Sequence, residues 1–314
     1  MIQLVIRRIL IMIPVLFLVS LLVFGMTYLT PGDPAVTLAG ENATEEQIEQ
    51  TRERLGLNDP LLEQYGRWAG NAVQGDLGSS LYSSQRVTDA ITQRLPTTVS
   101  LAAGAIIVAL IIGIPLGVLA AVFQGRLIDR VLTIGATFGL AMPNYFVGML
   151  LILVFAIWNQ VLPATSYVAL TDSPWEWFQH LLLPWLTLGL AAGAVITRQL
   201  RSSLIGVLGQ DYVRTARAKG LRGRSVVLKH AIKNAAIPVV TVLGSQVSIA
   251  LGGSVIIETV FGFTGVGQLL QSSVLRGDIP MIQGVVLMFT LIVLVVNLLV
   301  DLAYGYFNPR VRVQ

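Results

Sequence analysis

Six stretches of the chain carry no Asp, Glu, Lys or Arg and are dominated by Leu, Ile, Val, Ala and Gly. They cover residues 9–32, 95–125, 131–171, 177–197, 234–257 and 279–300. Each exceeds the roughly 20 residues with which an α-helix crosses about 30 Å of hydrocarbon. The pattern predicts an all-α integral membrane protein with six transmembrane helices.

The stretch 131–171 is long enough for two spans, but its second half is polar and prone to turns. That half contains residue types that favour loops, namely Asn159, Gln160, Pro163, Thr165 and Ser166. We predict one span over 131–158, followed by an external loop.

The first stretch follows Arg7 and Arg8, a pattern that also begins a cleaved secretory signal. It is longer than a signal core, however, and it ends in Thr30-Pro31-Gly32-Asp33 without a cleavage site of small residues. We therefore predict an uncleaved first helix, with the signal peptide as the alternative.

Residues 33–94 form a polar stretch that is long enough for a small fold of its own. Thr44 and Gln47 have the spacing of a capping box that opens a helix, and Gly56 is placed to end it. A second set of mostly apolar residues has helical spacing: Leu61, Leu62, Tyr65, Trp68 and Ala69. A turn is expected after it, over 75–80. We predict a helical extracytoplasmic region that lies on the outer face of the membrane.

The loops between the apolar stretches differ in charge, which sets the orientation because basic loops stay in the cytoplasm. With the N-terminus inside, the cytoplasmic side holds 15 of the 21 basic residues and three of the 17 acidic ones, Asp129, Asp211 and Asp301. Both termini are therefore predicted to be cytoplasmic. The net charge of +4 follows from this asymmetry and does not indicate a nucleic-acid partner.

The predicted organisation has four parts. They are a first helix at 1–32, the extracytoplasmic region at 33–94, a five-helix core at 95–305 with a basic cytoplasmic loop at 201–233, and a cytoplasmic tail at 306–314. Small residues recur four apart within the spans, which permits close helix packing inside the chain or at a subunit seam. They are Gly113 and Gly117, Gly135 and Gly139, Gly189 and Gly193, and the series Gly244, Ser248, Gly252.

The sequence lacks the residues that several kinds of functional site require. It has no cysteine, and none of its three lysines follows a glycine as in a phosphate-binding loop. Glu258, Asp301 and His180 lie at span ends, where we expect them to reach the interface, and the middles of the spans hold no ionisable residue. We expect no catalytic residue, metal site or cofactor on this chain.

A basic segment, 210–233, runs between the fourth and fifth spans and contains DYVRTARAKGL at 211–221. We predict two short helices joined by a hinge at Gly220, since glycine ends helices in the left-handed conformation. Tyr212, Val213 and Leu221 are apolar anchors for a partner's groove. Charge alone leaves two alternatives, a loop that only sets topology and a DNA-binding helix-turn-helix, and closely flanking spans argue against the second.

The order of residues in this segment, with HAIKNAAIPVVT after it, resembles the ATPase-docking loop of binding-protein-dependent ABC transporter permeases. The resemblance is strongest to the dipeptide, oligopeptide and nickel branch, and it extends along the chain through RRIL, TPGDPA, LGLNDPLLEQYGRW, GDLGSS, TQRLPTTVSLA, VFGFTGVGQLL and NPRVRV. The family's general loop begins Glu-Ala-Ala, where this chain has Arg214, Thr215 and Ala216. A salt bridge through that glutamate is therefore not expected, whereas the glycine at Gly220 is kept.

The resemblance implies a multi-pass permease subunit of an ATP-driven importer in the cytoplasmic (inner) membrane. Its partners would be a second homologous permease, two ABC ATPase subunits that hold ATP and Mg²⁺, an extracytoplasmic solute-binding protein and membrane lipid. The implied docking residues are Asp211, Tyr212, Arg214, Thr215, Ala216, Arg217, Ala218, Lys219, Gly220 and Leu221.

The implied cargo is a small peptide, dipeptide or oligopeptide, with nickel chelates or glutathione as alternatives within the same family. A self-contained channel or ion-coupled carrier is the rival from outside the family. The spans contain no midplane carboxylate, which argues against that rival.

Two further sets of residues are candidates for function. Polar residues within the spans could line a translocation path, or could form hydrogen bonds between helices: Asn144, Tyr145, Gln246 and Asn297. An external loop at 258–280 could reach into the binding protein's cleft, or could be a re-entrant packing loop. Its candidate residues are Glu258, Phe261, Gly262, Phe263, Gly265 and Gly267.

Overall fold

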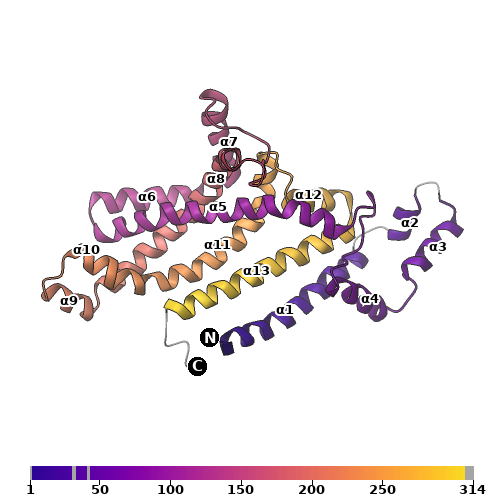
Figure 1. Ribbon diagram of the computed structural model, residues 1–314, viewed down its shortest axis with the longest axis horizontal. Coiled ribbons are helices and arrows are strands. Elements are labelled where there is room, and N and C mark those ends of the chain that lie inside the picture. The colour runs from indigo at the N-terminus through magenta and orange to yellow at the C-terminus, as the bar shows by residue number, and fades with distance from the viewer. Residues whose placement is uncertain (1, 30–32, 41–42, 308–314) are drawn as a thin grey trace. The chain divides into compact units, whose positions relative to one another are not determined.

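The computed structural model describes residues 2–29, 33–40 and 43–307, which are mostly helical (Figure 1). Its helices are α1 (Ile2–Leu29), α2 (Pro34–Ala39), α3 (Glu45–Leu55), α4 (Leu61–Val73), α5 (Val87–Val122), α6 (Leu127–Ala141), α7 (Asn144–Leu151), α8 (Pro174–Leu208), α9 (Asp211–Ala218), α10 (Gly223–Ser225), α11 (Ile232–Val260), α12 (Val266–Arg276) and α13 (Ile279–Phe307). Two π-helical stretches are η1 (Ile152–Trp158) and η2 (Val226–Ala231). Residues 30–32 of TPGDPA and the tail from 308 lie outside the described residues.

Within the described residues, five helical stretches are long and apolar enough to cross a membrane. They are Val5–Leu29, Val87–Val122, Pro174–Leu208, Gly223–Val260 and Ile279–Ala303, and the pair α6 and α7 with η1 makes a sixth if it counts as one span. The predicted class, an all-α multi-pass membrane protein, is confirmed.

The stretch predicted as one span over 131–158 is not one continuous helix, because it breaks in its middle. α6 ends at Ala141, Met142 adopts an extended conformation with ψ 130°, and α7 begins after Pro143. The two halves meet at 101°, and Figure 1 shows α7 turning away from α6. Proline disfavours the helical conformation of the residue before it, which places the break at Met142.

The chain divides into two compact units. Unit 1 comprises Met1–Arg8, Thr97–Phe263 and Val295–Gln314, and unit 2 comprises Ile9–Pro96 and Thr264–Leu294. The long helices α1, α5 and α13 each contribute residues to both.

Unit 1 is built around α8, which packs closely against α5 through glycines. A Cβ at Gly189 would lie 2.6 Å from a Val108 methyl, and one at Gly193 would lie 3.3 Å from the Ala109 carbonyl oxygen. Gly104 leaves room for the ring of Trp185, whose indole N–H donates to the Ser100 carbonyl at 2.9 Å. The small-residue spacing in α5 and α8 therefore serves packing within the chain.

The other small-residue series make fewer close helix contacts within the chain. Among the described residues, no atom lies within 4 Å of the Cβ position at Gly135 or Gly252, and Gly139 meets only the Ala194 methyl, at 3.5 Å. Gly244 does pack closely, with the Asn297 side-chain oxygen 3.2 Å from its Cβ position.

Unit 2 contains the helices predicted for the extracytoplasmic region. The capping box of Thr44 and Gln47 is present at the start of α3, and Gly56 ends this helix in the left-handed conformation with φ 64°. α4 covers the second predicted helical set, from Leu61 to Val73. Both helices confirm the local signals in the sequence.

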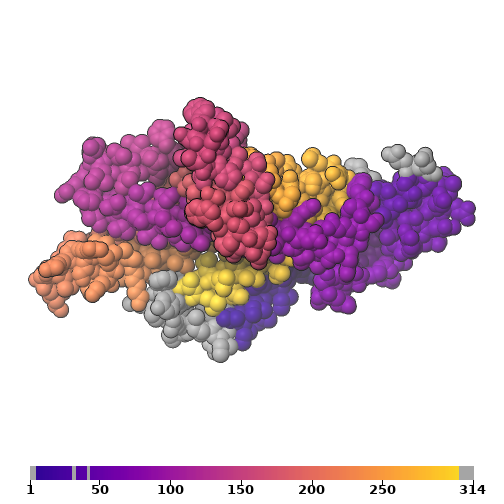
Figure 2. Space-filling model, turned by 45° about the horizontal axis from the view of Figure 1, so that its top comes forward, coloured from indigo at the N-terminus to yellow at the C-terminus, as the bar shows by residue number. Residues whose placement is uncertain are grey.

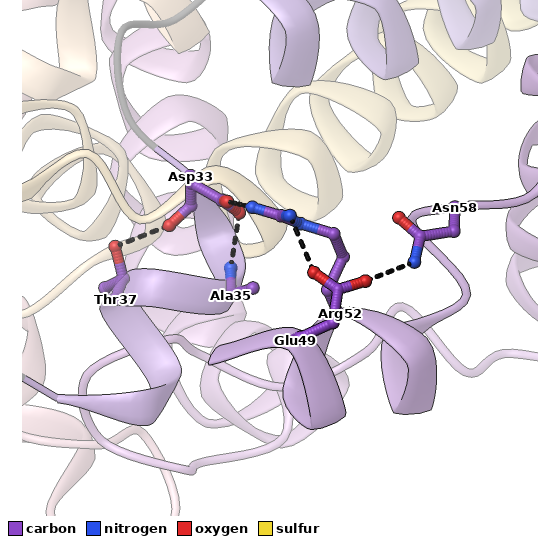
Figure 3. Close-up of polar contacts among 6 residues, drawn as sticks. All are labelled: Asp33, Ala35, Thr37, Glu49, Arg52 and Asn58. Carbon is purple, nitrogen blue, oxygen red and sulfur yellow. Dashed lines mark hydrogen bonds and ion pairs between the residues drawn. The ribbon is translucent and has the colours of Figure 1, made fainter. Parts of the chain in front are cut away.

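A polar network joins α2 to α3 in unit 2 (Figure 3). The Asp33 carboxylate accepts a hydrogen bond from the Ala35 amide at 2.8 Å and pairs with Arg52. Arg52 also donates to Glu49 at 2.9 Å, which accepts from Asn58 at 2.8 Å. Burial alone would raise the pKa of the Asp33 carboxyl, but the hydrogen bonds from Arg52 and Ala35 and the charge of Arg52 together lower it. The Asp33 side chain is therefore an ionised N-cap of α2.

Candidate functional site: the basic segment after α8

The basic segment, 210–233, forms helix α9, a glycine turn and then α10 with η2. Asp211 lies in the first turn of α9 and Arg217 in its last, where each charge complements the helix dipole. Gly220 has φ +78°. Its amide donates to the Arg217 carbonyl at 2.9 Å and the Leu221 amide donates to the Ala216 carbonyl at 3.4 Å, the two bonds of a Schellman ending. The left-handed helix end predicted at Gly220 is confirmed.

One side of α9 is fixed to its own chain. Val213 is fully buried, Ala216 is 8% exposed, and both pack with Val226 against the end of α8. The prediction that Val213 is an anchor for a partner is wrong, because the end of α8 and η2 already cover this side chain. Ala216 likewise packs against residues of its own chain, and its predicted contact with a partner stays a prediction.

Tyr212 links α9 to the start of α11. Its hydroxyl accepts a hydrogen bond from the Asn234 amide at 2.8 Å and donates to the His230 carbonyl at 3.4 Å. This carbonyl belongs to the π-helical stretch η2, where the ordinary α-helical ladder is interrupted. Tyr212 therefore connects α9 to η2 and to the first turn of α11 through polar contacts.

The outer side of the segment is strongly basic and open to solvent (orange in Figure 2). Arg214 is exposed and makes only a loose pair with Asp211, at 3.6 Å. The remaining exposed cations are Arg217, Lys219, Arg222, Arg224, Lys229 and Lys233. Tyr212 and Leu221 are 43% and 41% exposed, so the surface offers two apolar groups among positive charges.

A buried ion pair that the sequence reading did not find lies in the same unit. Asp129, at the start of α6, is 4% exposed and accepts from Arg201 Nε at 2.5 Å and from Arg201 Nη2 at 2.8 Å. The Gly125 amide donates to it at 2.8 Å. The only available signal was that Asp129 is one of three acidic residues on the basic side.

The path candidates do not converge on one cavity. Asn144 lines a cavity of about 400 Å³ bounded by α5, α6, α7 and α8, together with Thr187 and Thr197. Tyr145, its neighbour in α7, is 46% exposed. Gln246 and Asn297 are not among the residues that line this cavity. A path through these four residues stays a prediction.

Glu258 is interior, which corrects the expectation that it reaches the interface. It has no exposed surface, because the end of α11 packs against α5, and its carboxylate accepts from the Thr98 hydroxyl at 2.7 Å. Asp301, in contrast, keeps 25% of its side chain exposed and pairs with Arg8 at 2.9 Å. Of these two span-end acids, only Asp301 is open to its surroundings.

The aromatic side chains after α11 are also interior. Phe261 and Phe263 are fully buried and pack with Trp185 in the core of unit 1. Gly262 between them has φ +65°, which lets the chain turn so that both rings point inward. In unit 2, Gly265 precedes α12 and Gly267 lies buried in its first turn. Both rings therefore behave as expected for a loop that packs against its own chain, the alternative to one that reaches into the binding protein. Contact of the loop with a binding protein stays a prediction.

Comparisons with known proteins identify the class of this chain. The family model "Binding-protein-dependent transport system inner membrane component" matches residues 113–313, and a second model for the N-terminal part of such membrane components matches residues 1–102. The glutathione transport system permease proteins GsiC of Escherichia coli K12 and Shigella dysenteriae serotype 1 are each 44% identical over 312 residues, covering 99% of both chains.

A solved structure shares the fold. It is an inward facing conformation of the MetNI methionine ABC transporter, with a TM-score of 0.56 and 17% identity, covering 69% of this chain and 96% of that chain. The family expected from the sequence motifs is confirmed, and the family is that of the membrane component, with ATP hydrolysis on separate subunits. The chain therefore belongs to the binding-protein-dependent transport system inner membrane components, as a multi-pass permease subunit of an ABC importer.

Proposed function

We propose that this permease carries short peptides, of the size class of glutathione, from a solute-binding protein across the inner membrane. The proposal rests on the 44% identity over 312 residues with permeases named for glutathione transport. Glutathione is itself a tripeptide, so it belongs to the peptide class that the motifs predicted. A second permease and two ATPase subunits with ATP and Mg²⁺ complete the transporter in this proposal.

Competition for uptake tests the cargo. The complete transporter in liposomes, with its binding protein outside and ATP inside, is given labelled glutathione and an excess of unlabelled competitor. Dipeptides and tripeptides are expected to suppress uptake strongly, whereas a nickel chelate and free glutamate leave it unchanged. Suppression by the nickel chelate alone, or no ATP-dependent uptake of any peptide, would contradict the proposal.

The ATPase in this proposal binds the outer side of the basic segment. Arg214, Arg217 and Lys219 are open to acidic groups of a partner, and Tyr212 and Leu221 add apolar contact. Because Val213 holds the opposite side against α8, a pull on α9 reaches α8 directly. To shift the permease from 1:99 to 99:1 between its two conformations, the ATPase must bind one conformation more tightly by roughly 5.5 kcal/mol. A loose connection between α9 and α8 would reduce the part of this free energy that reaches the spans.

Gly220→Val is expected to uncouple ATP hydrolysis from transport while the protein remains folded. Gly220 needs φ +78°, a conformation that costs a side-chain-bearing residue roughly 1–2 kcal/mol and is worst for β-branched residues. Open space surrounds its Cβ position, so the strain falls on the helix end rather than on packing. Transport per ATP hydrolysed, measured in liposomes, is expected to fall several-fold.

Two variants control for this result. Gly220→Asn is expected to retain most coupling, since asparagine tolerates the left-handed conformation. Gly223→Val lies three residues further on, at a glycine without positive φ and also with open space, and it is expected to behave like the wild type. Normal coupling in Gly220→Val would exclude the hinge.

A further inference from the structure

Helix α4 lies along α1 rather than beyond its end. The Tyr65 and Ser20 hydroxyls are 2.7 Å apart, and the Tyr65 ring meets the edge of the Phe17 ring with centroids 6.1 Å apart. One turn further along α4, Trp68 packs on Phe24 with centroids 5.7 Å apart. All of these residues belong to unit 2, so α4 follows the outer half of α1 for about two turns.

These contacts set the depth of α4 in the membrane. α1 has no charged residue from Ile9 to its end at Leu29, about the length that crosses the hydrocarbon. Ser20 precedes Leu29 by nine residues, which is about 13 Å along a helix. Tyr65 therefore meets α1 well below the outer boundary of the apolar span.

The polar side of α4 borders a cavity within unit 2. Gln64, Arg67 and Asn71 line a cavity of about 490 Å³ together with residues of α1 and α13. Gln64 is 8% exposed; it accepts from the Tyr28 hydroxyl at 2.5 Å and donates to the Asp59 carbonyl at 2.8 Å. Gln64 is thus hydrogen-bonded within the protein, whereas Arg67 keeps half of its side chain exposed and Glu63 and Asn71 are exposed.

The apolar edge of α4 faces outward. Leu62 is 84% exposed and Val73 is 90% exposed, and Ala69 lies between them at helical spacing. An amphipathic helix on a water-soluble protein turns its apolar side inward. The apolar side of α4 is divided: Tyr65 and Trp68 pack on α1, whereas the edge with Leu62 and Val73 is turned outward. An outward apolar edge is favourable where the surroundings are hydrocarbon.

We propose that α4 is an interfacial helix embedded in the outer leaflet, with the edge formed by Leu62, Ala69 and Val73 in contact with phospholipid acyl chains. α1 also carries exposed apolar side chains of its own, with Leu18 and Leu22 59% and 72% exposed. The surface area of three small or medium side chains is also far smaller than the roughly 800 Å² that each partner buries in a stable protein interface. Lipid fits both the depth and the chemistry.

Spin-label accessibility tests the proposal, and the chain contains no cysteine that must first be removed. Leu62→Cys and Val73→Cys are labelled with a nitroxide in the complete transporter in phospholipid nanodiscs. Collisions with oxygen, which partitions into lipid, are compared with collisions with a water-soluble nickel chelate. Leu22→Cys on α1 is the lipid reference, and Glu53→Cys on the exposed side of α3 is the aqueous reference.

Both α4 labels are expected to resemble Leu22, with oxygen accessibility dominant and several-fold above the ratio at Glu53. Nickel-dominated accessibility like that at Glu53 would place α4 in water and overturn the proposal. Low accessibility to both reagents would show that a protein subunit covers the edge and would overturn it as well. Quenching of a fluorophore at Val73 by brominated phospholipid gives an independent reading, and its absence counts against lipid contact.

Discussion

Asp129→Ala is expected to destabilise this permease by roughly 1–3 kcal/mol, the usual cost of leaving buried hydrogen-bonding groups unpaired, since Asp129 is buried while Arg201 keeps 28% of its side chain exposed. The Asp129 carboxylate is 4% exposed and takes two hydrogen bonds from Arg201, at 2.5 and 2.8 Å. Its loss leaves the guanidinium without a counter-charge between α6 and α8, and it also leaves the Gly125 amide unpaired. We expect less folded protein than for the wild type, and correspondingly less uptake.

This effect is measured by heating the purified protein in detergent and determining the fraction that remains monodisperse at each temperature. Asp59→Ala removes a partner of the exposed pair with Arg67, whose side chains are 39% and 50% exposed, and should cost at most about 1 kcal/mol. The double variant Asp129→Asn with Arg201→Met removes the charge yet leaves an acceptor for Gly125, so it should be more stable than Asp129→Ala. Equal losses at Asp129 and Asp59 would show that the buried pair has no special weight.

Gly113→Leu is expected to separate α5 from α8 and to cost about 3 kcal/mol or more, at the upper end of overpacking effects. A Cβ at Gly113 would lie 2.8 Å from the Gly193 carbonyl oxygen and 2.8 Å from the Ile196 Cβ. Neither atom is the end of a flexible side chain, so the clash is relieved only when the helices move apart. Transport is expected to fall with the amount of folded protein.

The same unfolding measurement with a graded series checks this expectation. Gly113→Ala should fall between the wild type and Gly113→Leu. Gly135→Ala is the matched control, since it lies on α6 beside a cavity and no described atom is within 4 Å of its Cβ position; it should be neutral or gain up to about 1 kcal/mol from helix propensity. A Gly113→Leu variant as stable as Gly135→Ala would show that α5 and α8 do not depend on close approach.

The features that the sequence predicted well are local ones. Charge-free length located the spans, the Thr44 and Gln47 spacing located the start of α3, and Gly220 marked the end of α9. Each depends on a few neighbouring residues. The break at Met142 was also local, and Pro143 was its signal, but a single proline is compatible with either a kinked or a broken helix.

The features that the sequence could not supply depend on residues far apart in the chain. Val213 resembled a surface anchor until the end of α8 was found to cover it. Phe261 and Phe263 looked accessible because they follow a span, whereas their burial arises from α8 and α5. The helical periodicity of a sequence does not show which other helix of the chain packs against a given face of a helix.

The pairing of Asp129 with Arg201 also has a consequence for biosynthesis. The two residues are 72 positions apart, and at 5–20 residues per second the ribosome needs roughly 4–14 s to add that length. During this interval Asp129 lacks its counter-charge. Its position in the first turn of α6, beside the turn at Gly125, lets it wait at the aqueous boundary until α8 is inserted.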